Sequence, residues 1–362
     1  MRVLAFRKRL IIVGIERSDK MLEMELGPIR PPSESESLML RVTRGCHWNK
    51  CYFCDLYKQY KFSRRKYKEI EEDLKRAAES KYAHKYTTCF LQDADAFVLK
   101  TEFLIKILEG IHYYLPNIKS VTTYARADSI ARKSVSEIKE LKAAGIDHLY
   151  CGMETGSDII LKKINKGFDA ATIIIGGVKA KEAEMTLSEF TLFGIGGREL
   201  SEENAVETAK VLNIIKPDYI RVHATGLKIS SQMWNYVKNK ELTLQSEEEI
   251  VEEQKMLLEL LSDDMNCMYM NEHIVNLLLE VRGNIRTEKK KMLTTIDTYL
   301  NLPQEDKELF NLGRRLNIMF VLADLNSKSK RKAVKDQMDK LKNKLDHFDL
   351  PFICNYVRQT QI

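Results

Sequence analysis

Between residues 38 and 225 of this chain, short apolar runs alternate with longer amphipathic segments. Six of the apolar runs have the length and bounding residues of buried strands, namely 38–45, 87–93, 120–126, 148–154, 187–194 and 218–225. The segments between them, such as 63–80 and 101–115, carry apolar residues at helical spacing. This order predicts repeated βα units and therefore an α/β fold built on a parallel sheet.

Two α/β architectures fit six such units: an open doubly wound sheet and a partial (β/α)6 TIM-like barrel. A dinucleotide-binding doubly wound fold needs a glycine-rich phosphate turn directly after its first strand. The first strand here ends at a cysteine-containing turn instead, so we favour the partial barrel of parallel strands. Past residue 228 helix-forming residues dominate, as in 244–261 and 330–345. We therefore expect an N-terminal extension (1–37), a partial-barrel domain (38–227) and a C-terminal mainly helical region (228–362).

The charge and hydropathy of the chain exclude some partners. Its 362 residues include 58 Lys and Arg against 52 Asp and Glu, a net charge of +6 that is spread along the sequence. This balance permits a nucleic acid partner, although no recognisable RNA-binding module supports one. No apolar stretch reaches the ~18 to 20 residues of a membrane span, and the N-terminus lacks the features of a secretory signal. We expect a soluble, cytoplasmic protein with no membrane partner.

Three of the seven cysteines, Cys46, Cys51 and Cys54, fall within nine positions at the end of the first predicted strand. Parallel sheets and barrels place their active sites at this end of their strands. A structural zinc or an electron-transfer cluster normally takes four protein ligands, whereas three leave one position open for a substrate or cofactor. Cysteines this sparse do not form a disulfide scaffold, so the loop predicts a metal site in a reducing compartment.

The run Cys46-His-Trp-Asn-Lys-Cys51-Tyr-Phe-Cys54 resembles the cluster-binding loop of the radical S-adenosylmethionine (SAM) superfamily. In that family three cysteines hold a 4Fe-4S cluster, and the fourth iron chelates SAM. The resemblance implies both cofactors, with these three cysteines as metal ligands and Phe53 beside the adenine. The spacing departs from the family's usual C-x3-C-x2-C, because four residues separate the first two cysteines; some members share this variation.

The same spacing leaves two other metal sites open. C-x4-C-x2-C followed by a distant cysteine is also the pattern of plant-type ferredoxins, and Cys89 could be the fourth ligand. A zinc site is the other alternative. Ferredoxins are small, acidic and antiparallel, whereas this chain is large, mildly basic and built of βα repeats. The context therefore favours the radical SAM loop.

The resemblance extends to polar residues at the ends of later strands. Residues 152–157 and 165–167 are similar to segments of the branch that contains oxygen-independent coproporphyrinogen oxidase, the tRNA methylthiotransferases and the elongator catalytic subunit. In that branch Glu154 would bond the ribose hydroxyls or the amino group of SAM, and Lys166 would meet its carboxylate. Residues 92–95 stand where the family has a Gly-Gly-Glu segment that receives the SAM ammonium; an acidic helix cap is the alternative. The candidate cofactor-binding residues are Phe53, Gln92, Asp93, Asp95, Tyr124, Arg126, Glu154, Lys166 and Ser188.

The function implied by the resemblance is reductive cleavage of SAM to methionine and a 5′-deoxyadenosyl radical. The radical would abstract hydrogen from a substrate, which we expect to be a small molecule, in an anaerobic reaction supplied by an external electron donor of the ferredoxin or flavodoxin type. Two alternatives stay open: a radical SAM enzyme that modifies RNA, and a non-catalytic iron–sulfur electron-transfer protein.

Overall fold

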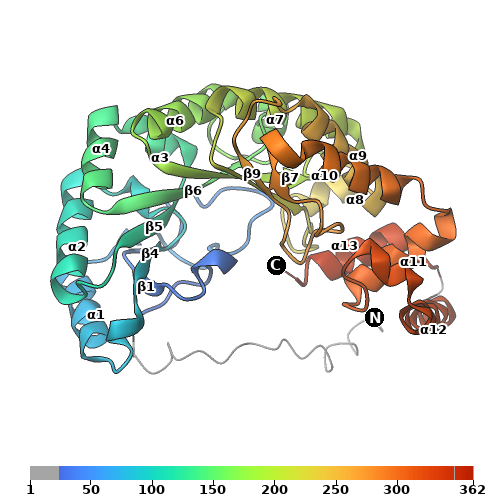
Figure 1. Cartoon of the computed structure of the whole chain (residues 1–362), viewed down its shortest axis with the longest axis horizontal. Helices are drawn as coiled ribbons and strands as arrows, with labels where there is room; N and C mark the ends of the chain where they lie inside the picture. The colour runs from blue at the N-terminus through green and yellow to red at the C-terminus, as the bar shows by residue number, and fades with distance from the viewer. Residues whose placement is uncertain (1–23, 346, 362) are drawn as a thin grey trace.

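The computed structural model describes residues 24–345 and 347–361. Eight strands form one curved sheet in the order β1-β4-β5-β6-β7-β8-β9-β10, in which every neighbouring pair is parallel except β9 and β10. The strands are β1 (Leu38–Arg41), β4 (Thr88–Gln92), β5 (Ser120–Ala125), β6 (Ile146–Glu154), β7 (Thr186–Phe193), β8 (Tyr219–Ala224), β9 (Met268–Met270) and β10 (Gly283–Asn284). Helices line the convex side of the sheet (Figure 1). The expected α/β partial barrel is confirmed, with β1 and β10 as its two ends.

The two faces of the sheet differ in burial. Side chains of β8 alternate along the strand: Ile220 and Val222 lie in the large apolar core beneath the helices, whereas Tyr219 and His223 are only partly buried. On β9, Tyr269 is likewise fully buried in the core, between two half-buried methionines. The outer face is therefore packed, and the inner face keeps contact with solvent.

Seven helices accompany the strands up to β8. They are α1 (Tyr67–Glu79), α2 (Thr101–Tyr114), α3 (Ala127–Arg132), α4 (Val135–Ala143), α5 (Asp158–Lys163), α6 (Ala170–Glu182) and α7 (Ser201–Ile215). The start of α4 shows how local sequence sets a boundary, because Ser134 and Glu137 form a reciprocal capping box. The short helix α3 follows β5 directly and was not expected from the sequence.

The first predicted strand, 38–45, is interrupted in the structure. Only Leu38–Arg41 joins the main sheet, while β2 (Thr43–Arg44) pairs in antiparallel fashion with β3 (Ser63–Arg64). Between them, the Val42 amide bonds Gln92 and its carbonyl bonds Arg65, so the chain changes partner at this residue. The helix expected from residue 63 consequently begins at Tyr67.

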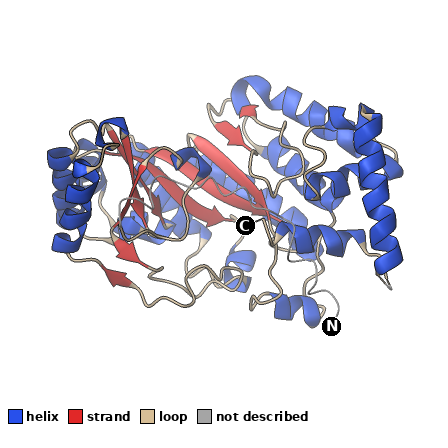
Figure 2. Cartoon of the chain, turned by 90° about the horizontal axis from the view of Figure 1, so that it is seen from below, coloured by secondary structure: helices blue, strands red, loops and turns tan. Residues whose placement is uncertain are grey.

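The C-terminal region is mainly helical, as expected. Its helices are α8 (Trp234–Lys238), α9 (Glu247–Leu260), α10 (Ile285–Leu300), α11 (Gln304–Arg315), α12 (Lys328–Lys344) and α13 (Leu350–Arg358). Two short strands also occur in this region, because β9 and β10 extend the sheet beyond the six predicted strands. Seen from below, the strands lie between α1 and α2 on one side and the C-terminal helices on the other (Figure 2). None of the described helices combines the length and the apolar composition that crossing a membrane requires.

Residues 24–37, part of the expected N-terminal extension, lie against the sheet rather than apart from it. The Gln92 side chain accepts from the Gly27 amide (2.9 Å) and donates to the Ile29 carbonyl (3.0 Å). Further along, the Tyr150 hydroxyl donates to Glu34 (2.7 Å). Along their strands, Gln92 and Tyr150 alternate with residues of the core, so their side chains point to the inner face. Residues 24–37 therefore cover part of the inner face.

Candidate active site at the strand ends

The three cysteines of the loop that follows β2 lie in one neighbourhood. Cys51 is buried, and Cys46 and Cys54 are half-buried. Burial raises the pKa of the Cys51 thiol, and it raises that of Cys54 to about 11. Negative charge on Cys51 and Cys46 also raises the pKa of Cys54, so the three thiols share one electrostatic environment. Low dielectric around thiolate ligands is a usual feature of iron–sulfur sites.

The three thiols do not form a preassembled site for a single metal ion. No group of three or more His, Cys, Asp or Glu side chains in the described part of the chain is placed to hold one metal ion. A cluster carries each thiolate on a different iron, so it does not require three sulfurs to converge on one point. Three neighbouring thiols that do not converge are compatible with a cluster.

The cysteine loop is bonded to the segment that follows α5. The Trp48 indole donates to the Asn165 carbonyl (2.8 Å), and the Asn165 side chain donates back to the Lys50 carbonyl (3.0 Å). The Tyr52 amide donates to the Ile164 carbonyl (2.9 Å). These bonds join two stretches more than a hundred residues apart and fix the loop beside Lys166.

Lys166 and Glu154 form a largely buried ion pair at the end of β6. Their side chains meet at 2.6 Å with exposures of 7% and 13%. Burial alone would lower the pKa of Lys166, but Glu154 and Cys51 raise it, so the side chain stays charged. The pKa of Cys51 in turn responds to Lys166, Arg126 and Glu154. The thiols and this ion pair therefore share one site.

Arg126 completes the cationic side of the site. One of its Nη atoms donates to the Lys166 carbonyl (2.9 Å), and its Nε donates to Asp128 (2.9 Å). Its guanidinium lies over the rings of Trp48 (5.6 Å) and Phe168 (4.8 Å). Arg126 is only 6% exposed, so its ion pair with Asp128 is largely buried.

The acidic residues after β4 are held by neighbours in the chain. Asp93 accepts from Arg41 Nε (3.0 Å) and from the Gly45 amide (2.9 Å), while its buried Oδ1 atom has no hydrogen-bond partner. Asp95 accepts from Ser129 (2.6 Å) and lies 3.1 Å from His47 Nδ1. Neither side chain caps a helix. Gln92 is occupied by residues 27 and 29, as described above.

The remaining three candidates lie in different surroundings. Tyr124 points to the inner face and packs edge-on against Phe90 (5.0 Å between ring centroids). Phe53, next to Cys54, packs against a smaller apolar cluster that includes Ile160, Ile164 and Leu227. Ser188 lies in the first half of β7, where its hydroxyl bonds His148 (2.8 Å) and Arg221 (3.2 Å). The structure thus groups Ser188 with the inner face, not with the Glu154 and Lys166 pair.

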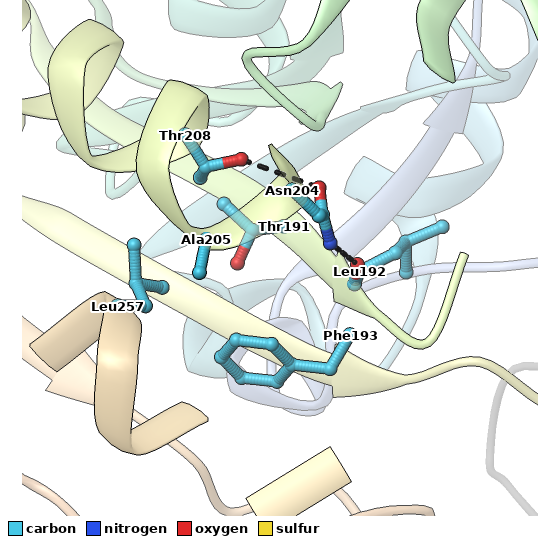
Figure 3. A pocket seen from close by; sticks show the side chains of 7 residues that line it. All are labelled: Thr191, Leu192, Phe193, Asn204, Ala205, Thr208 and Leu257. Atoms are coloured by element: carbon cyan, nitrogen blue, oxygen red, sulfur yellow. Dashed lines mark hydrogen bonds between the residues drawn. The ribbon is translucent and has the colours of Figure 1, made fainter. Parts of the chain in front are cut away.

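Helix α7 supports the strand ends from behind (Figure 3). The Asn204 side chain donates to the Leu192 carbonyl (2.9 Å), and Thr208 donates weakly to Asn204 Oδ1 (3.4 Å). The Thr208 hydroxyl also accepts from the Gly156 amide (2.9 Å). A β-carbon on Gly156 would collide with the backbone of α7. The turn after Glu154 is therefore packed directly on α7.

Sequence reasoning missed several residues of the site. Trp48 and His47 lie between the cysteines, and a large aromatic residue in so short a loop was the available signal. Lys58 donates to the Asn49 carbonyl (2.8 Å) and the Cys51 carbonyl (3.0 Å), which nothing in the sequence indicated. The sequence likewise gave no sign that residues 24–37 contact the sheet.

Comparison with known proteins places this geometry in a family. Residues 40–212 match the family model described as the Radical SAM superfamily, whose members use a 4Fe-4S cluster and SAM. No curated protein matches the sequence. The family match spans β1 to α7 and includes the cysteine loop and the residues at the end of β6.

Several solved structures are similar at low identity. Methylornithine synthase is 14% identical, with 62% of this chain and 63% of that chain covered and a TM-score of 0.44. The cobalamin-dependent SAM radical enzyme OxsB, with aqua-cobalamin and SAM bound, is 14% identical over 90% of this chain and 53% of its own, with a TM-score of 0.48. The methyltransferase TsrM from Kitasatospora setae is 11% identical, with 83% of this chain and 61% of that chain covered and a TM-score of 0.47. This chain thus covers less than two thirds of each of these proteins, and values this low carry no conclusion about its substrate.

The family assignment rests on the matched domain and agrees with the cysteine loop at the strand ends. This match identifies residues 40–212, a little under half of the chain, as a radical SAM domain.

Proposed function

We propose that this protein is a radical SAM enzyme in which Cys46, Cys51 and Cys54 hold a 4Fe-4S cluster. One observation carries the proposal: the cysteine loop is bonded to the segment that holds Lys166, so three thiols and a buried ion pair lie together. Three thiols leave one iron open, and the charged pair beside them matches a zwitterionic cofactor.

The side chains of the site suit SAM. A buried ammonium on Lys166 binds a carboxylate, and Arg126 adds a second positive charge next to it. The Glu154 carboxylate accepts from hydroxyl or ammonium groups. We assign the SAM carboxylate to Lys166 and the ribose hydroxyls or amino group to Glu154. When bound, the cluster and SAM supply one-electron cleavage of SAM and an organic radical.

We further propose that the substrate is a small molecule that binds on the inner face of the sheet. Residues 24–37 cover part of this face, and its side chains are only partly exposed, so the space suits a compact ligand better than a folded RNA. The four other cysteines are all buried. The reducing electron is therefore assigned to an external protein of the ferredoxin or flavodoxin type.

Anaerobic reconstitution tests the proposal. We expect about four irons per chain, a reduced-cluster spectrum that changes when SAM is added, and formation of 5′-deoxyadenosine. Each of Cys46→Ala, Cys51→Ala and Cys54→Ala should lose most of the iron.

Cys89→Ala is the matched control for these variants. Cys89 is fully buried near the start of β4, whereas the cysteine loop lies beyond the carboxyl end of the neighbouring β1. This variant should keep the cluster and the SAM-dependent change. Loss of iron in Cys89→Ala would favour the ferredoxin-type site. A wild-type cluster whose spectrum does not change with SAM would reject the proposal that the protein is a radical SAM enzyme.

A further inference from the structure

The inner face of β6, β7 and β8 carries a group of aromatic and basic side chains that the SAM site does not use. Its members are His148, Tyr150, Ser188, Phe190, Tyr219, Arg221 and His223. Each alternates along its strand with residues of the outer face. We name this set the inner-face group.

Arg221 is the charged member of the inner-face group, and it is held in place. It is 8% exposed. Its guanidinium carbon lies 5.3 Å from the Tyr150 ring centroid and 5.5 Å from that of Tyr219. Its Nε donates to Ser188 (3.2 Å), whose hydroxyl also bonds His148 (2.8 Å). The side chain is therefore fixed by stacking and by one hydrogen bond.

No carboxylate of the described chain forms an ion pair with Arg221, whereas the buried cations Arg41 and Lys166 are paired with Asp93 and Glu154. Glu34 also contacts Tyr150, but its two oxygens already accept from Tyr150 (2.7 Å) and Ser37 (2.5 Å). His148 adds no charge, because burial and Arg221 lower its pKa to about 4. A buried cation without a counter-charge is costly, which suits a site completed by an anion.

The two terminal nitrogens of Arg221 remain available. Within the described residues, only its Nε makes a hydrogen bond, and neither terminal nitrogen is among the fully enclosed atoms that lack a partner. A planar guanidinium with two free nitrogens binds a carboxylate or phosphate in a forked geometry.

Strand register places Arg221 level with the proposed SAM site. Gly152 pairs with Phe190, and Phe190 pairs with Arg221. A β-carbon on Gly152 would lie 2.7 Å from Glu154 Oε1 and 3.4 Å from Lys166 Nζ, so Gly152 touches the ion pair. Two strand spacings separate Gly152 from Arg221, about 10 Å. A metabolite-sized molecule spans this distance.

From these contacts we infer that Arg221 binds the carboxylate or phosphate of a small anionic substrate, whose reacting end lies beside Gly152 and the Glu154–Lys166 pair. The ring of Phe190 lies between the two ends and contacts the apolar middle of the ligand. The inference rests on the proposed function for its reaction, but the anion site itself is tested by binding alone.

The test uses reconstituted protein with an oxidised cluster, saturating SAM and no reductant, so that no turnover occurs. Benzoate, phenyl phosphate and the neutral benzyl alcohol are titrated by calorimetry. We expect the wild type to bind one of the two anions at least ten-fold more tightly than the alcohol, and the preferred anion identifies carboxylate or phosphate. In Arg221→Gln this preference should disappear.

Arg286→Gln is the matched control, because Arg286 is exposed and its guanidinium bonds the Asp264 carbonyl. It should keep the preference for the anion. The inference is overturned if Arg221→Gln keeps the preference or if the wild type shows none. Should Arg221→Gln not fold, Arg221→Lys decides: weaker anion binding by three-fold or more supports the site, and unchanged binding rejects it.

The two proposals fail separately. Cleavage of SAM by the reduced wild type in the absence of substrate reports on the cluster and on the SAM residues. If this cleavage occurs while anion binding is independent of Arg221, only the anion site is rejected. If anion binding depends on Arg221 while SAM is never cleaved, only the enzymatic proposal is rejected.

Discussion

Gly167 and Trp48 pack so closely that no β-carbon fits between them. A β-carbon on Gly167 would lie 2.8 Å from Cδ2 of the indole and closer still to two other ring atoms, and the φ of Gly167 is +88°. The same approach lets the indole nitrogen reach the Asn165 carbonyl. The position of the cysteine loop therefore depends on a glycine outside it.

Gly167→Ala should displace the loop. The added methyl group would strain a backbone that favours glycine and push the indole away, at a cost of about 1–3 kcal/mol. We expect the variant to fold with reduced iron content after reconstitution. Gly145→Ala is the control, since Gly145 also has a positive φ (+118°) but lies at the start of β6. It should lose stability and keep its iron; equal iron in both variants would contradict the role of Gly167.

Lys166→Met should weaken SAM binding without removing the cluster. A charge-assisted hydrogen bond contributes about 1.5–3 kcal/mol, so the dissociation constant for SAM should rise roughly ten- to hundred-fold. Equilibrium dialysis of the reconstituted variant measures this. Lys163→Met is the comparison, because Lys163 bonds the Glu241 carbonyl at an exposed position. Unchanged SAM affinity in Lys166→Met would remove Lys166 from the proposed site.

The sequence was sufficient for the parts of the fold that repeat. Runs such as 148–154 and 218–225 were located to within two residues of β6 and β8, because a strand covered by helices needs a continuous apolar face. The loop from Cys46 to Cys54 was recognisable because thiol spacing is a local property.

Features made by long-range contacts could not be predicted. β9 has three residues, too few for an alternation to be counted, and it is a strand because β8 offers an open edge. Ser188 was expected near SAM, but only the register of β6 and β7 shows that it faces Tyr150. The bond between Gly27 and Gln92 joins residues with no shared pattern.

A buried ion pair joins the helices of the C-terminal region. Glu247 of α9 accepts two hydrogen bonds from Arg315 of α11 (2.8 and 2.7 Å), and Arg358 lies 3.6 Å away. Glu247→Gln should lower the free energy of unfolding by about 3–5 kcal/mol, because it leaves buried guanidinium groups without a counter-charge. Urea denaturation measures the loss. Glu305→Gln removes an exposed pair with Lys335 and should cost far less than Glu247→Gln, because solvent screens that pair.

Glu247 should also make the free energy of unfolding depend on pH in the acid range. Burial alone would raise its pKa, but Arg315 and Arg358 lower it to about 2 from the ordinary 4.5. The unfolded chain therefore binds a proton more readily than the folded one in this range. The contribution of Glu247 is complete above pH 4.5 and is lost as the pH falls toward 2. A profile that is as steep in Glu247→Gln as in the wild type would contradict this assignment.

Glu189 should produce the opposite dependence on the alkaline side. It lies on the outer face of β7, its two carboxyl oxygens are buried, and burial raises its pKa to about 8 although the Cys151 thiol beside it lowers the pKa. Folded protein therefore keeps this proton at neutral pH, while the unfolded chain releases it near pH 4.5, so stability falls as the pH rises from 4.5 to 8. Glu189→Gln has nearly the same shape and no charge, so its advantage over the wild type should be larger at pH 8.5 than at pH 5 in urea denaturation of the reduced apoprotein. Thr191→Val, on the same face, should shift stability equally at both pH values; an equally constant shift in Glu189→Gln would show that Glu189 does not titrate in the core.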